Sequence, residues 1–390
     1  MTERNAGYQV VVVGGGYAGV VAANRLRKRG DVGITVVNPR GEFVDRIRLH
    51  QFVAGTGGAV IDYGSLLGEG VRLVVDTATG IDVGGRVVRL GSGREVGYDY
   101  LVYAVGSTAG RAGVRGVEEF AYSVGEIEGA RRLRDRLGEL GVGEPVVVVG
   151  GGPTGIEVAA ELAERGRGVT VVSGVGLMPS LSERGRRYVA KWLSRNGVEV
   201  AAGEVVEVRA DSVVLADGGV LPSAVTVWAT GFGVPGLAAD SGLRTDSIGR
   251  MLTDETLTSV DDDRIVATGD AAAPSGQPLR MSSQAAGALG ARAADTVLSR
   301  IAGTEPAVID LALTGTCVSL GRRDGIRQLA RKDDTAVNIY IGGWMGARIK
   351  EGTCKLGVWK MRREARKPGS LFWPKGGPRP SIAASKVISA

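Results

Sequence analysis

The sequence is poor in the residues that build metal sites and disulfide frameworks. It contains one histidine, His50, and two cysteines, Cys317 and Cys354, which lie far apart and outside any C-x-x-C motif. A single histidine excludes a metal site made of several histidines, and it argues against a Ser-His-Asp triad. Two separate cysteines are typical of a reducing compartment. We therefore expect neither a metal site nor structural disulfides.

Long apolar runs are absent as well. No stretch of about 18 apolar residues occurs, so the sequence predicts no transmembrane helix. The N-terminal residues contain no apolar segment of a signal peptide. We expect a cytoplasmic protein whose contact with the inner face of a membrane, if it has one, is peripheral.

Basic residues are concentrated at one end of the chain. The segment from Arg348 to Ala390 contains eleven Lys and Arg and two Glu, whereas the whole chain has a formal net charge of only +6. Trp359, Phe372 and Trp373 are interleaved with these charges. Residues 348–380 have three open interpretations: a disordered solvated end, an anchor on an anionic membrane surface, or a nucleic-acid contact. Only charge favours the last, because no nucleic-acid-binding module accompanies it.

Glycine is abundant, and part of it follows a functional pattern. Residues 10–19 read VVVVGGGYAG, with Gly14, Gly16 and Gly19 spaced as G-x-G-x-x-G between a predicted strand and a predicted helix. The first glycine permits a tight turn, the second lets the backbone approach a pyrophosphate, and the third lets the helix pack on the strand. Free N–H groups at the start of the helix favour anionic phosphates.

The same pattern occurs a second time. Residues 145–155 read PVVVVGGGPTG, so that Gly150, Gly152 and Gly155 repeat the spacing. A helix over 156–165 and a strand over 169–172 follow. Two copies in the same strand–turn–helix–strand context indicate two dinucleotide sites in one chain.

Further predicted elements lie between and after these motifs. The strand over 34–37 ends at Asn38, whose side-chain oxygen can accept a hydrogen bond from a ribose hydroxyl. Alternating apolar and polar residues predict an antiparallel meander over 71–81, 86–90 and 95–98. Buried strands are expected over 100–105, which ends at Gly106, over 224–229, and over 264–267, which runs into Gly269-Asp270, and an Ala-rich helix is expected over 282–299.

The order of these motifs resembles a known family. A first G-x-G-x-x-G, a second one in an inserted unit, the stretch Ala229-Thr230-Gly231 and then Thr268-Gly269-Asp270 are similar to the flavoproteins with two dinucleotide-binding domains. Over residues 8–300 the chain is most similar to the type II NADH dehydrogenase and apoptosis-inducing-factor-like branch.

The resemblance implies the fold and its division. It implies an α/β chain with two Rossmann-like, three-layer dinucleotide-binding domains, the second inserted in the first, and a C-terminal α+β region. The FAD-binding domain is expected at residues 1–118 and 246–303, and the NAD(P)H-binding domain at 119–245. The C-terminal region is expected at 304–390.

The resemblance also implies the cofactors and the residues that hold them. FAD belongs to the first site and NAD(P)H, as co-substrate, to the second. Asp270 is expected to accept a hydrogen bond from the ribityl chain of FAD, and Glu157 to lie near the nicotinamide. The remaining residues expected to contact cofactors are Gly14, Gly16, Gly19, Asn38, Gly106 and Gly269 for FAD, and Gly150, Gly152 and Gly155 for NAD(P)H.

Three departures from the family pattern affect the chemistry. Disulfide-reducing relatives have C-x-x-x-x-C where this chain has residues 45–50, so no dithiol relay is expected. Ser173 stands where an acidic residue would repel a 2′-phosphate, so a strong preference for NADH is not enforced. Gln284 matches one glutamine of the quinone signature, but Ala288 replaces the second, which argues against a quinone as acceptor.

We expect an enzyme, an FAD-dependent NAD(P)H oxidoreductase. Hydride would pass from the nicotinamide to flavin N5, and electrons would then pass to a quinone or a small biosynthetic acceptor. Glu157, Gln284 and His50 are the candidate catalytic residues, His50 as a proton donor because an ordinary imidazole has a pKa of about 6.5. The alternative is a redox-sensing flavoprotein with slow turnover that acts through a partner. A homodimer is compatible with both hypotheses.

Overall fold

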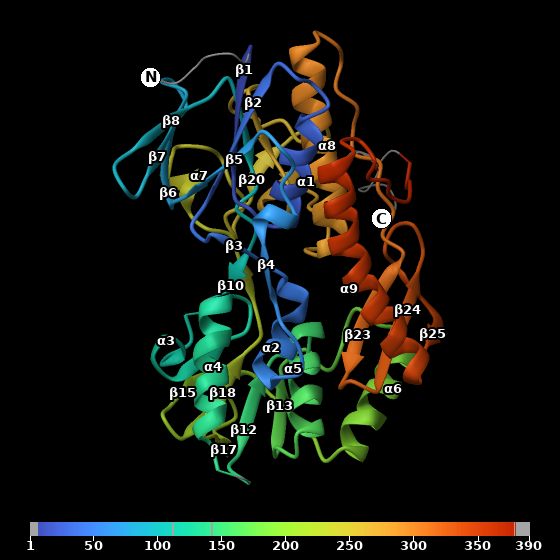
Figure 1. Cartoon of the computed structure of the whole chain (residues 1–390). Helices are drawn as coiled ribbons and strands as arrows, with labels where there is room; N and C mark the ends of the chain where they lie inside the picture. Colours follow the sequence, from blue (N-terminus) through green and yellow to red (C-terminus); the bar gives the residue numbers. More distant parts are fainter. Residues whose placement is uncertain (1–6, 111–112, 142, 378, 380–390) are drawn as a thin grey trace, which may run out of the picture.

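The chain folds into two parallel β-sheets that lie one above the other in Figure 1, with a smaller third unit at the side. The computed structural model describes residues 7–110, 113–141, 143–377 and 379. Each parallel sheet has five strands and lies between helices and a three-stranded antiparallel meander. The predicted α/β class with two Rossmann-like, three-layer units is thereby confirmed.

The first sheet carries the first glycine-rich turn, and its strands lie in the order β21-β9-β1-β2-β5. The valines of β1 are buried because both faces of this central strand are covered. Helices α1 and α8 cross closely, since a Cβ added at Gly290 would lie 2.2 Å from the carbonyl oxygen of Ala18. The elements are β1 (Tyr8–Val13), α1 (Tyr17–Leu26), β2 (Val32–Asn38), β5 (Val71–Val75), β9 (Tyr100–Tyr103), β21 (Ile265–Ala267) and α8 (Ser283–Ile301), with the meander β6 (Ala78–Asp82), β7 (Val87–Leu90) and β8 (Glu95–Gly97).

The prediction that the meander begins at residue 71 is wrong. Residues 71–75 form β5, which pairs in parallel with β2, with Ile34 opposite Val71. The meander begins only at β6. An edge strand of a parallel sheet is half-exposed, and its alternating pattern therefore looks like that of an antiparallel strand.

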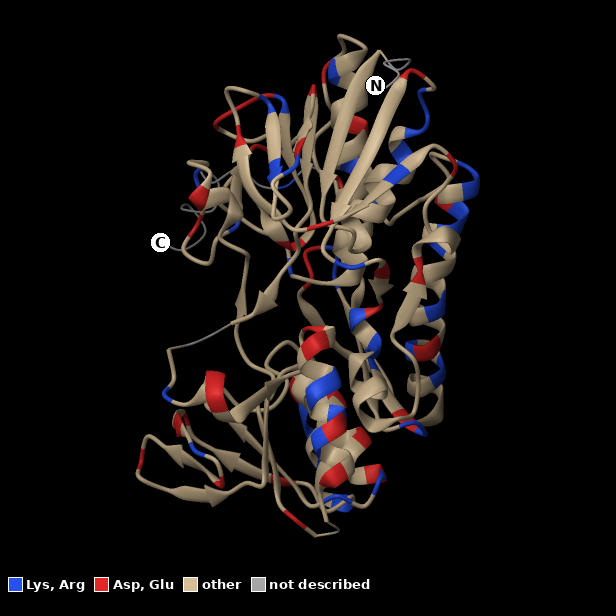
Figure 2. Cartoon of the chain, turned by 60° about the vertical axis from the view of Figure 1, so that its left-hand side comes forward, with Lys and Arg blue, Asp and Glu red and all other residues tan. Residues whose placement is uncertain are grey.

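The second sheet repeats this plan, with its strands in the order β11-β18-β12-β13-β14. The inward faces of the Arg/Glu-rich helix α4, which Figure 2 shows with alternating charges at lower centre, and of α5 pack on one side of the sheet. The meander β15–β17 packs on the other side. The elements are β11 (Ala121–Ser123), α4 (Ile127–Glu139), β12 (Val146–Val149), α5 (Pro153–Glu164), β13 (Val169–Ser173), α6 (Glu183–Arg195), β14 (Glu199–Ala202), β15 (Val205–Val208), β16 (Ser212–Leu215), β17 (Val220–Pro222) and β18 (Val225–Trp228).

The second unit is inserted in the first. Every strand of its sheet lies between residues 121 and 228, after which β21 returns to pair with β9 of the first sheet. The exact limits 1–118, 119–245 and 246–303 remain predictions.

A short helix from the first unit lies against the second. Helix α2 (Leu49–Ala54) follows a 3-10 turn at Arg46–Arg48 and packs against α4 and α5. Its residues Leu49 and Val53 belong to the apolar core of the second unit. This contact places His50 between the two units.

The third unit is the expected C-terminal α+β region. Strands β23 (Gly315–Leu320), β24 (Asp324–Ala330) and β25 (Ala336–Ile341) form an antiparallel sheet, and α9 (Gly343–Arg366) packs on β23, β24 and α1. The strands predicted near residues 317 and 337 are present. The short remaining elements are β3 (Glu42–Val44), β4 (Val60–Asp62), Tyr63–Ser65, β10 (Thr108–Ala109), α3 (Val117–Phe120), β19 (Phe232–Gly233), α7 (Leu237–Asp240), β20 (Met251–Thr253), Gly269–Ala271 and β22 (Ala272–Pro274).

The interpretation of the basic tail as a disordered end is wrong for residues 348–377. Helix α9 buries Lys350, Cys354 and Met361 on one face. Beyond it, Trp373 donates from its indole nitrogen to the carbonyl of Asp310 at 2.8 Å. The rest of the tail, residues 378 and 380–390, lies outside the described residues. Within the described ranges, no helix is long and apolar enough to cross a bilayer.

A buried carboxylate holds the chain after α9. Glu364 is fully buried and accepts hydrogen bonds from the backbone N–H of Gly369 at 2.6 Å and of Leu371 at 2.5 Å. Its Oε1 also lies 3.5 Å from the guanidinium of Arg25 on α1. Glu364 therefore joins the end of the chain to the first unit.

We expect Glu364→Ala to lower the free energy of unfolding by about 3–5 kcal/mol, because it leaves buried N–H groups and part of a buried ion pair unsatisfied. Urea unfolding measures the change. The exposed Glu305 gives a matched control, and Glu305→Ala should change the free energy by less than about 0.5 kcal/mol. Equal effects of the two substitutions would contradict this role of Glu364.

Candidate functional site

Two cavities meet between the units. The smaller, of about 310 Å³, lies at the carboxyl ends of the strands of the first sheet, where open α/β sheets bind their ligands. The larger, of about 490 Å³, lies where all three units come together. The two share six lining residues, so they form one continuous groove: Tyr17, Arg46, Ser107, Gly125, Asp270 and Ala286.

The glycines of the first turn are constrained in different ways. Gly14 has a φ of +105°, and a Cβ there would lie 2.3 Å from the carbonyl oxygen of Ala104. A Cβ at Gly19 would lie 1.9 Å from the carbonyl oxygen of Gly14. Gly16 differs, because a Cβ there would meet no atom within 4 Å and would project into free space. Gly16 lines the smaller cavity, so this position is open for a ligand.

The second turn repeats these constraints. Gly150 has a φ of +128°, and a Cβ at Gly155 would lie 2.0 Å from the carbonyl oxygen of Gly150. Gly152 has no neighbour within 4 Å of such a Cβ and lines the larger cavity. In both turns two glycines are required by the fold and one leaves room beside a helix N-terminus. Both turns therefore fit the pyrophosphate of a dinucleotide.

Asn38 organises the first turn from the end of β2. Its Oδ1 accepts a hydrogen bond from the N–H of Gly15 at 2.9 Å, and its Nδ2 donates to the carbonyl of Arg40 at 2.8 Å. A carbonyl oxygen has two lone pairs, so a ribose contact through Oδ1 stays a prediction.

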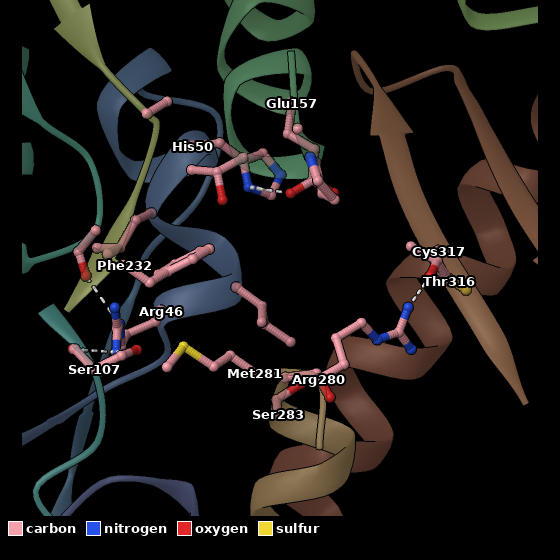
Figure 3. Close-up of a pocket in the computed structure, with 18 of the residues that line it drawn as sticks. Arg46, His50, Ser107, Glu157, Phe232, Arg280, Met281, Ser283, Thr316 and Cys317 are labelled. Carbon is pink, nitrogen blue, oxygen red and sulfur yellow. Dashed lines mark hydrogen bonds and ion pairs between the residues drawn. The ribbon is translucent and has the colours of Figure 1, made fainter. Parts of the chain in front are cut away.

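Asp270 lies where the two cavities join. Its Oδ2 accepts a hydrogen bond from Ser107 Oγ at 2.8 Å. Arg46 donates to the carbonyls of Ser107 at 2.8 Å and Gly125 at 2.9 Å, as Figure 3 shows for Ser107. Gly106 and Gly269, beside these residues, have positive φ angles of +74° and +67° and line the smaller cavity.

A buried charged cluster lies at another wall of the larger cavity. Glu157, in the first turns of α5, has Oε1 2.7 Å from Lys350 Nζ and accepts a hydrogen bond from the N–H of Ser319 at 3.0 Å. Its Oε2 lies 3.4 Å from His50 Nδ1. Burial is the largest effect and alone would raise the pKa of Glu157, but Lys350, His50 and the hydrogen bond from Ser319 together lower it. Burial is the largest effect on the pKa of Lys350 and would lower it, but the pKa is raised because Glu157, Cys354 and Cys317 together favour the ammonium.

His50 is neutral at pH 7. Burial lowers the pKa of its imidazole to about 4, although Glu157 acts in the opposite direction. The proton-donor role predicted for His50 assumed an ordinary pKa of about 6.5. With a pKa of about 4, the imidazole carries no extra proton to donate near pH 7. The carboxylate beside Nδ1 favours a proton on that nitrogen, and Nε2 is buried without a hydrogen-bond partner.

The structure brings the predicted catalytic residues together. Glu157, His50 and Gln284 all line the larger cavity. Gln284 lies in the first turn of α8, where Ser282 caps the helix by accepting from the N–H of Ala285 at 3.2 Å. Ala288, one turn further on, is buried in the core of the first unit and does not line this cavity.

Several lining residues were missed by the sequence analysis. They are Lys350 from the tail, Arg46, Arg280 and Cys317, of which Figure 3 shows the last three around the cavity. A weak signal for Lys350 existed, since Gly346, Lys350, Cys354, Met361 and Ala365 follow the spacing of a buried helix face.

Comparison with known proteins agrees with this geometry. The family model described as pyridine nucleotide-disulphide oxidoreductase matches residues 8–290. An NADH dehydrogenase-like protein of Mycobacterium tuberculosis is 34% identical over 299 residues, which cover 68% of this chain and 73% of that protein. A type II NADH:quinone oxidoreductase of Staphylococcus haemolyticus is 27% identical over 88% of this chain and 98% of its own length.

A solved structure shares the fold as well. The sulfide:quinone oxidoreductase of Aquifex aeolicus superposes with a TM-score of 0.77 over 93% of each chain, at 22% identity. The family match covers both glycine-rich turns and the strand before Asp270. The chain therefore belongs to the pyridine nucleotide-disulphide oxidoreductase family and is an FAD-dependent NAD(P)H oxidoreductase.

Proposed function

We propose that this chain transfers two electrons from NAD(P)H, by way of FAD, to a quinone. The main supporting observation is the larger cavity. The second glycine turn lines one side of it, and α8 and the third unit line another side. The type II NADH:quinone oxidoreductase of Staphylococcus haemolyticus, similar over 98% of its length, also favours this acceptor.

The chain's own residues position the two nucleotides. In this proposal Gly14, Gly16 and Asn38 hold the adenosine and pyrophosphate end of FAD, and Asp270 accepts from its ribityl chain. Gly150 and Gly152 hold the pyrophosphate of NAD(P)H. When bound, FAD supplies a carrier that accepts hydride from the nicotinamide and passes the electrons on.

The acceptor side is made by α8 and the third unit. Gln284 would donate a hydrogen bond from its amide to an acceptor carbonyl, and Lys350 holds protons at Nζ on the cavity wall. The absence of a second glutamine at position 288 is weaker evidence against a quinone than the sequence suggested. Ala288 is buried in the core of the first unit and does not line the larger cavity.

We expect Gly16→Ala to weaken FAD retention at least about tenfold, equivalent to about 1.4 kcal/mol. The added methyl group strains no part of the fold but occupies the space of the pyrophosphate. Flavin absorbance per protein after desalting measures the loss. Gly152→Ala is the matched control, since it should keep FAD and raise the KM for NAD(P)H instead. A Gly16→Ala protein with full flavin content would refute the assignment.

We expect Gln284→Ala to slow oxidation of the flavin by a short-chain quinone about threefold to tenfold, the loss of one hydrogen bond. Its anaerobic reduction by NADH or NADPH should stay nearly unchanged. Stopped-flow absorbance resolves the two half-reactions. A slower reductive step with a normal oxidative step would place the acceptor elsewhere. A wild-type flavin that stays reduced with every quinone would favour the redox sensor.

We also propose that α9 contacts an anionic membrane surface. Its outward face carries Met345, Leu356 and Trp359, each 46–49% exposed, among basic residues. Figure 2 shows Lys and Arg along most of the long helix at the right-hand edge. Arg363 lies over the Trp359 ring at 5.2 Å. Basic residues beside exposed apolar side chains suit the interface of an anionic bilayer.

We expect the double substitution Leu356→Ser and Trp359→Ser to weaken binding to anionic vesicles at least about tenfold, given about 1.5–3 kcal/mol for each large apolar side chain buried. Vesicle co-sedimentation at low salt measures it. Val75→Ser, at a similarly exposed position on the first sheet, should have no effect. Equal binding by all three proteins would exclude this surface. Deleting the tail is not a clean test, since it removes Met361 and Glu364 from the core.

A further inference from the structure

Two buried polar atoms in the contact between α2 and α5 lack hydrogen-bond partners. They are Nε2 of His50 and Oε1 of Glu161. Glu161 lies one helical turn after Glu157, so the two carboxylates share a face of α5 and are about 6 Å apart at Cβ. Buried polar groups are normally satisfied by protein or by ordered water, so an ordered water is expected beside these atoms.

Thr56 can hydrogen-bond with the Glu161 side chain in both of its protonation states. Thr56 Oγ1 lies 2.8 Å from Glu161 Oε2 and 3.3 Å from the carbonyl oxygen of Gln51. When Glu161 is ionised, the hydroxyl can donate to its carboxylate. When Glu161 is protonated, the hydroxyl can donate to the carbonyl of Gln51 instead, and its oxygen can accept a hydrogen bond from the carboxyl O–H. The site therefore holds Glu161 with or without a proton.

Glu161 also has a connection to solvent. Arg322, 37% exposed in its side chain, lies 3.6 Å from Glu161 Oε1 and 3.7 Å from Glu351. Burial raises the pKa of Glu161, against the effects of Thr56 and Arg322, so its proton is held more firmly than that of a surface carboxyl. The charged and titratable groups that act on this contact are Glu157, Lys350, Arg322 and Arg48 around His50, and Arg322 and Glu164 around Glu161.

We propose that Lys350 gives a proton to the acceptor, and that Glu161, which takes up protons from solvent, restores it to the Glu157–Lys350 pair through a bridging water and His50. This inference depends on the proposed function, in which NAD(P)H, one proton and a quinone give NAD(P)⁺ and a quinol. Hydride from the nicotinamide accounts for both electrons and one proton. The second proton comes from solvent, and this route supplies it. Glu161 and His50 are positioning residues, because they act through Glu157 and Lys350.

The first test observes His50 directly. It is the only histidine in the chain, so histidine labelled with ¹⁵N gives one pair of ring signals in the oxidised holoprotein. We expect the Nε2 signal to show a titration step that belongs to Glu161. The step should disappear in Glu161→Gln and persist in Glu305→Gln, a matched change of an exposed carboxylate outside this contact.

The second test uses half-reactions. In Glu161→Gln, oxidation of the flavin by a short-chain quinone should slow at least about tenfold and show a larger solvent deuterium isotope effect. Reduction by NADH should stay within about twofold. Thr56→Val should act in the same direction, and it serves as the second variant if Glu161→Gln fails to fold.

The proposal is overturned if the His50 titration in the variant matches wild type, or if quinone oxidises both at the same rate and with the same isotope effect. If no quinone oxidises the wild-type flavin, the proposed function fails, whereas the His50 titration still tests the link between Glu161 and His50.

Discussion

The buried ion pair between Glu157 and Lys350 is the contact on which the arrangement of the site depends. Removing two charges from water is costly, and the cost is offset only when the pair is close and its remaining atoms are hydrogen-bonded. Both conditions hold here, since Nζ lies 2.7 Å from Oε1 and the Ser319 N–H donates to the same oxygen. The pair joins α5 of the second unit to β23 and α9 of the third, and His50 brings in α2 from the first.

The two glycine turns are governed by a different constraint, the space around the backbone. In each turn the first and third glycines are enclosed by carbonyl oxygens that a side chain would meet at 1.9–2.7 Å. The middle glycine faces free space instead. The first and third positions therefore preserve the turn, whereas the middle position keeps room for a ligand. The two glycine turns line one continuous groove, so the two nucleotides that they fit would lie close to each other.

Helix α9 combines two surfaces that serve different parts of the protein. Its inner face supplies Lys350 and Cys354 to the cavity, and Glu364 then anchors the chain to α1. Its outer face presents basic and aromatic side chains. The proposed acceptor cavity and the proposed membrane surface therefore lie on different faces of one helix.

Much of the fold was predictable from the sequence because it is encoded locally. A strand of valines, a glycine-spaced turn and a helix lie within some twenty residues, so each nucleotide unit could be recognised from adjacent residues. Gly16 and Gly152 were singled out in this way, whereas Asp270 and Gln284 came from the resemblance to the family. Glu157 and His50 were singled out too, but their contact with each other was not predicted. The strand β5 was misassigned because its half-exposed pattern fits two kinds of sheet.

The environment of the site, in contrast, depends on contacts between distant residues. The charge pattern of the tail is the same whether Lys350 is solvated or buried, and only the packing of α9 against β23 and β24 places it beside Glu157. The pKa of His50 is likewise lowered by burial and by the distant cations Lys350 and Arg322, which no neighbouring residue in the chain reveals. Local patterns therefore predicted two dinucleotide sites, whereas long-range packing set the charges and protons where the two sites meet.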